Sequence, residues 1–133
     1  MYHLRIVLSL LFVLNCFSDN SIAQTRTYSK QEITNLTDEA SRYLKESNFE
    51  KSLDISKLAL RSSINANDLY STAISYITIA ANYAEMAEFD KAIFFYNKSL
   101  SYADKTSNDT LRKRINNNLG NIHCFEKQQY EKG

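Results

Sequence analysis

A repeat of about forty residues runs through most of the chain and restricts its fold more than any other feature. The matched pairs, each 40 positions apart, are Ala40 and Ala80, Tyr43 and Tyr83, Phe49 and Phe89, and Leu60 and Leu100. A third copy begins on the same spacing with Gly120 and His123, and Tyr130, the aromatic residue matched to Phe89, lies 41 positions beyond it. A period of this length is typical of small structural units stacked into an array.

Each copy predicts a pair of helices. Ser29 and Glu32 stand at the two positions of a capping box, in which each side chain bonds a free backbone N–H at a helix start. Apolar residues then recur at steps of three and four, the spacing of one helical face. The expected helices cover about 29–46, 49–64, 69–87 and 89–105, followed by a third unit whose second helix begins near Tyr130.

Composition agrees with an all-α chain. Proline is absent and only two glycines occur, fewer turn residues than an all-β domain of 133 residues normally needs. The segment from Ala73 to Ile79 is rich in β-branched residues and resembles a strand in isolation. It lacks clean alternation, and its counterpart one period earlier is plainly helical. The repeat therefore predicts a helix here as well.

The first 23 residues have the pattern of a secretory signal peptide. Arg5 precedes an uncharged, mostly apolar run from Ile6 to Phe17, and small residues stand at Ser21 and Ala23. The run is short for a membrane-spanning helix, which needs about 20 residues. Cleavage after Ala23 is expected, with an uncleaved N-terminal anchor as one alternative. A second alternative is lipidation at Cys16, although its surroundings match a lipobox only loosely.

The repeat units resemble tetratricopeptide repeats of the longer kind. The second unit carries the pattern best, at Tyr76, Ile79, Ala80, Tyr83, Phe89, Ala92, Tyr96 and Leu100. The first unit departs from it at Glu39 and Ser52, the third at His123, and the usual proline is missing throughout. The resemblance implies an all-α fold of antiparallel helix pairs, a short right-handed α-solenoid of about five helices after the signal peptide. Its domain would cover 24–133, with units at about 29–66, 67–107 and an incomplete 108–133.

The sequence offers little for catalysis, so an enzyme is not expected. His123 falls at a helix-packing position, and Cys124 beside it points to a different helix face. No other His or Cys stands at a metal-ligand spacing, and neither a metal nor another cofactor is expected. The carboxylates of Glu85, Glu88 and Asp90 cluster at one inter-helix turn, where solvated charge is the preferred interpretation.

The balance of charge also limits the choice of partner. Sixteen Lys and Arg stand against fifteen Asp and Glu, a net charge of +1, without the concentrated basic stripe that nucleic-acid binding needs. In the resembled family, ligands lie in a concave groove lined by the first helix of each unit. Carried over by register, the groove residues would be Thr37, Ser41, Ile77, Ala81, Ala84, Arg114, Asn117 and Asn121. The family's clamp for a peptide carboxylate is broken at Ile77 and Ala81.

These features predict a protein-interaction module that is exported to the periplasm or cell envelope of a bacterium. Its partner would be a protein or peptide held in the groove. The apolar residues Leu119, Ile122 and Phe125 would lack a covering helix, which favours a chain that continues past Gly133. An alternative is therefore the N-terminal sensor segment of a longer, membrane-anchored transcriptional regulator or histidine kinase. An enzyme whose catalytic domain lies beyond Gly133 is a further alternative.

Overall fold

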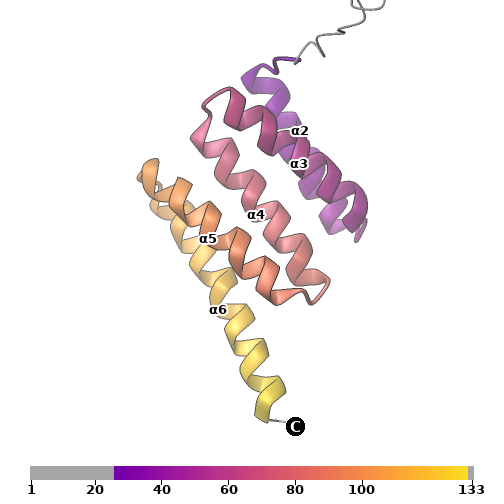
Figure 1. The fold of residues 1–133 in the computed structure, drawn as a ribbon, viewed down its shortest axis with the longest axis vertical. Coiled ribbons are helices and arrows are strands. Elements are labelled where there is room, and N and C mark those ends of the chain that lie inside the picture. Colours follow the sequence, from indigo (N-terminus) through magenta and orange to yellow (C-terminus); the bar gives the residue numbers. More distant parts are fainter. Residues whose placement is uncertain (1–25, 132–133) are drawn as a thin grey trace, which may run out of the picture.

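The computed structural model describes residues 26–131, and within them every regular element is an α-helix. The expected signal peptide lies outside the described residues. The helices are α2 (Lys30–Lys45), α3 (Phe49–Asn65), α4 (Leu69–Glu85), α5 (Phe89–Lys105) and α6 (Asp109–Glu131). Each packs on the next along the chain, and α2 also packs on α4 (Figure 1). The predicted all-α, repeat-like arrangement of five helices is confirmed, including a helix for the β-branched segment 73–79.

The turns between helices repeat every twenty residues. Ser47, Asn67, Ala87 and Ser107 each have a φ between 51° and 58°, in the left-handed region. At each turn the N–H of the following residue bonds the carbonyl five positions back, as Asn48 does to Tyr43 at 2.9 Å. This is the Schellman arrangement, which satisfies the last carbonyls of a helix and reverses the chain. Each unit contains two helices and two such turns, so turns spaced twenty residues apart give the forty-residue period.

The residue after each left-handed position begins the next helix. Asn48, Asp68 and Asn108 accept a hydrogen bond on their side chains from the backbone N–H three residues later. Glu88 occupies the same place at the start of α5 without such a bond. The capping box predicted at α2 is present, since Ser29 and Glu32 bond each other's backbone N–H. Short polar side chains thus define most helix starts.

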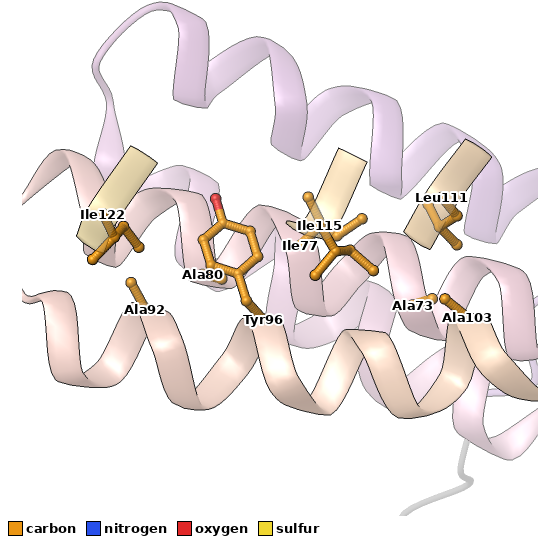
Figure 2. Close-up of a cluster of buried hydrophobic side chains, with 9 residues drawn as sticks. All are labelled: Ala73, Ile77, Ala80, Ala92, Tyr96, Ala103, Leu111, Ile115 and Ile122. Carbon is orange, nitrogen blue, oxygen red and sulfur yellow. The ribbon is translucent and has the colours of Figure 1, made fainter. Parts of the chain in front are cut away.

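The core changes character along the array. Between α4, α5 and α6 it is apolar and consists of Ala73, Ile77, Ala80, Ala92, Tyr96, Ala103, Leu111, Ile115 and Ile122 (Figure 2). Where α3 meets α4, small polar side chains are buried instead, among them Ser52, Ser56, Ser63, Thr72, Ser75 and Asn82. Small residues bring helices close enough for direct contact with the backbone. The Ser99 hydroxyl on α5, for example, donates to the Ala73 carbonyl on α4 at 2.8 Å.

Helix α6 differs from the prediction for the third unit. It continues through Glu131 with no turn before Tyr130. Figure 1 shows its C-terminal half extending past the turn between α4 and α5. Ile122, expected to be uncovered, is only 4% exposed, whereas Phe125 is 60% exposed. The prediction that His123 occupies a packing position is wrong, because no described helix covers that side of α6 and its side chain is 63% exposed.

The outward side of α6 is polar. Its exposed residues are Lys113, Asn116, Asn117, Gly120, His123 and Cys124. The residues 40 positions before two of these, Tyr76 and Tyr83, are aromatic and lie half-buried against α5. The outward side of α6 therefore lacks the apolar surface with which α4 receives α5. Among residues 26–131, no helix is long and apolar enough to cross a membrane.

Candidate functional site

A groove of about 460 Å³ lies where the C-terminal half of α6 passes the turn between α4 and α5. Its walls come from the end of α4, the start of α5 and one side of α6. The lining residues are Ala81, Ala84, Glu85, Ala87, Phe89, Tyr96, Asn118, Asn121, Ile122 and Phe125. The groove forms because α6 carries apolar residues on the side facing α5 and amide residues on the adjoining side.

Three of the eight residues predicted for a concave groove line this one, namely Ala81, Ala84 and Asn121. Thr37 and Ile77 are buried in helix packing and offer no surface to a ligand, which corrects the expected set. Ile77 belongs to the core between α4 and α6, as Figure 2 shows. The array therefore turns this side of α4 inward, against α5 and α6, and leaves Ala81 and Ala84 half-exposed beside it.

The other predicted residues lie apart from the groove lining. Ser41 on α2 is half-buried, and its hydroxyl donates to the Thr37 carbonyl one turn earlier at 2.9 Å. Arg114 and Asn117 are exposed on α6, on the two turns that precede Asn121. Arg114 remains close enough for its charge to act on the groove, since it lowers the pKa of Tyr96.

Tyr96 forms the floor of the groove. It rises from α5 beside Ile122 and Ile115 (Figure 2), and the whole residue is 3% exposed. Burial raises the pKa of its phenol to about 12, and the charge of Glu85 also raises it, while Arg114 and a hydrogen bond with Asn118 lower it. Burial prevails because a buried phenolate loses its hydration. At neutral pH the phenol is therefore an uncharged hydrogen-bonding group and a poor nucleophile.

Two aromatic rings line the groove beside the start of α5. The ring centroids of Phe89 and Phe125 are 6.3 Å apart and their planes are tilted by 44°. Phe125 is held on one side only, which leaves most of its ring in solvent. Sequence reasoning noted both residues, Phe89 as core and Phe125 as an uncovered apolar residue, but did not place them together. The bend of the chain between α5 and α6 brings these residues, 36 positions apart, into contact.

The residues weighed for catalysis do not assemble a reactive site. His123 lies on the solvent side of α6, with its Nδ1 3.4 Å from the Glu126 carboxylate, and neither residue lines the groove. Cys124 is a free and exposed thiol. The Glu88 carboxylate pairs with the Lys91 ammonium at the start of α5. Within the described part of the chain, no three His, Cys, Asp or Glu side chains are grouped to hold a metal ion.

No family model matches the chain, and no curated protein or solved structure matches it either. The resemblance to tetratricopeptide repeats therefore stays a prediction from the residues of this chain.

Proposed function

We propose that the chain is a binding module that holds an extended segment of a partner protein in the groove between α4 and α6, and that it catalyses no reaction. The observation that carries the proposal is the pairing of two unlike walls. The wall from α4 and α5 is apolar at Ala84 and Phe89, whereas the wall from α6 carries the amides of Asn118 and Asn121 beside the ring of Phe125. An extended peptide presents the matching features, since it alternates side chains with unpaired backbone amides.

The chemistry of the walls supports a peptide over a small molecule. A primary amide can donate to a peptide carbonyl and accept from a peptide N–H at once. An apolar side chain of the ligand would lie against the exposed ring of Phe125, which packs on Phe89. The groove is open at its rim, so a chain can pass through it. Its volume is enough for one or two large side chains.

The titratable groups of the groove support binding rather than catalysis. Tyr96 stays protonated at neutral pH because its pKa is raised to about 12, so it cannot serve as a general base there. Glu85 is exposed at the rim, where a carboxylate remains solvated. Neither residue is within hydrogen-bonding distance of a described hydroxyl or thiol nucleophile on a neighbouring helix.

The proposal includes an exported protein with a scaffold role of the tetratricopeptide kind. It is supported by the forty-residue helix pairs and by the charged, apolar and small-residue zones of residues 1–23. The alternative, a sensor segment of a longer membrane-bound regulator, would bind a partner in the same groove. An immunoblot of fractionated source cells separates the two. A periplasmic band a little below 15.4 kDa supports the scaffold, and a much heavier inner-membrane band supports the sensor.

Binding is tested by selecting displayed random peptides on the full chain and measuring their affinities by calorimetry. We expect Asn121→Ala and Phe125→Ala to weaken the selected peptides by about five- to tenfold, the effect of losing roughly 1 kcal/mol. Asn117→Ala is the matched control, because Asn117 is an exposed asparagine of the same helix that does not line the groove. Equal losses in all three variants, or no selected peptide, contradict the proposal.

A further inference from the structure

Glu85 stands where a negative charge is unfavourable for the helix that carries it. It is the last residue of α4, and the carbonyl end of a helix is the negative end of its dipole. The last turns of α2 and α5 carry the favourable positive charge instead, at Lys45 and Lys105. Lys45 occupies the same place in the first unit, 40 positions before Glu85. Helix stability therefore gives no reason for a carboxylate at this position.

No contact within the described residues compensates for this charge. Glu85 makes no ion pair there, and the nearest lysine along the chain, Lys91, is paired with Glu88 and lies over the ring of Tyr83. The Glu85 side chain instead lies on the groove, close enough for its charge to raise the pKa of Tyr96. The unpaired carboxylate and the apolar wall thus meet at one place.

We infer that the groove selects a peptide segment in which a lysine or arginine side chain stands beside a large apolar one. This inference rests on the proposed function and specifies its ligand. The apolar side chain lies against Ala84, Phe89 and Phe125, and the cation pairs with the Glu85 carboxylate at the rim. The ligand cation also removes the unfavourable interaction of Glu85 with the end of α4.

Arg114 does not oppose this arrangement. It lies seven residues before Asn121 on α6, which is about 10 Å along the helix axis. Its charge acts on Tyr96, but Arg114 does not line the groove, whereas Glu85 does, so a ligand cation in the groove meets the Glu85 carboxylate first.

The test uses short peptides, acetylated and amidated so that their termini carry no charge. Each contains one phenylalanine followed by lysine, glutamine or glutamate, and binding to the full chain is followed by fluorescence polarisation. We expect the lysine peptides to bind about three- to fivefold tighter than the glutamine peptides, as for one exposed ion pair, and the glutamate peptides to bind weakest. With Glu85→Gln this order should disappear, and with Glu85→Lys it should reverse.

Thermal unfolding of the same variants separates recognition from folding. Glu85→Lys restores the residue type found at Lys45, so the melting temperature should stay equal or rise while lysine peptides lose affinity. An unchanged preference for lysine in both variants overturns this inference and leaves the proposed function standing. If no peptide of any series binds the wild-type chain, both are overturned. The control Glu50→Gln alters an exposed carboxylate on α3 outside the groove and should leave the preference intact.

Discussion

The amide nitrogen of Asn82 on α4 donates a 2.8 Å hydrogen bond to the hydroxyl of Ser52 on α3, and both side chains are fully buried. The Ser52 hydroxyl in turn donates to the Ala40 carbonyl on α2 at 2.8 Å. One serine therefore connects three helices at the boundary between the first and second units. A buried hydroxyl that both donates and accepts is costly to remove, because its partners then lose a bond away from water.

Ser52→Ala is expected to destabilise the chain by about 1–3 kcal/mol, because the Asn82 amide is left with one unpaired N–H. Ser56→Ala is the matched comparison, since Ser56 lies one turn further along α3 and is equally buried, but its hydroxyl has no hydrogen-bond partner in the described structure. That substitution should be neutral or stabilising by up to about 0.5 kcal/mol, because alanine also has the better helix propensity. Urea unfolding of the two variants checks the difference, and equal losses would show that the Ser52 contacts contribute nothing.

Ala87→Gly is expected to stabilise the chain by about 1 kcal/mol. Ala87 has a φ of 58°, a conformation in which its Cβ is strained and which glycine adopts freely. Asn67→Gly at the equivalent turn should gain less, because asparagine tolerates the left-handed region better than alanine does. Thermal unfolding monitored by circular dichroism measures both. A lower melting temperature for Ala87→Gly would contradict the prediction.

Glu88→Asp should add about 0.5–1 kcal/mol at the start of α5. Among the residues that begin the described helices, Glu88 makes no hydrogen bond from its side chain to the backbone N–H three residues later. At the equivalent position, Asp68 accepts such a bond from the Ser71 N–H at 3.0 Å. The shorter carboxylate can reach the N–H of Lys91 in the same way and still attract the Lys91 ammonium. The reverse change, Asp68→Glu, should cost a similar amount. Urea unfolding of the two variants should show shifts of opposite sign.

Much of the fold was predictable from the sequence because local chemistry repeats with the forty-residue period. The helix starts at Phe49, Leu69 and Phe89 were predicted to the residue. Phe49 and Leu69 each follow a short polar pair in which one residue turns the chain and the next begins a helix, and Phe89 lies one forty-residue period after Phe49. The expected turn before Tyr130 is absent for the same reason. The residues there, Glu126 to Gln129, are good helix formers and offer no asparagine, serine or aspartate to start a new helix.

The candidate site was predictable only in part. The period fixes which residues of α4 share a face, but it does not fix how far that face turns toward α6. Ile77 was therefore predicted in the groove and is buried below it, while Ala81 and Ala84 remain at the surface. Tyr96 and Phe89 were assigned to the core, and each has one edge on the groove. Whether such residues lie in the groove or in the core depends on the angle between the helices. That angle arises from contacts between segments distant in the sequence.

Tyr96 should ionise later than an ordinary tyrosine, and this gives a test of its burial. Its folded pKa is raised to about 12, chiefly by burial, whereas in the unfolded chain the value is about 10. Above pH 10 the unfolded chain therefore releases a proton that the folded chain retains, so the contribution of Tyr96 to stability is complete below pH 10 and is lost as the pH rises toward 12.

Absorbance of tyrosinate at high pH checks the assignment. Tyr96→Phe should remove the latest-titrating part of the curve, together with part of the fall in urea-unfolding stability between pH 10 and 12. Tyr43→Phe is the opposite control, because hydrogen bonds with Lys51 and Arg42 lower the pKa of Tyr43 and its loss should remove an early-titrating part. Burial also raises the pKa of Tyr76, so the late part should shrink rather than vanish. If the upper end of the curve is unchanged in Tyr96→Phe, the phenol of Tyr96 is in contact with water. That result would contradict its assignment as the buried floor of the groove.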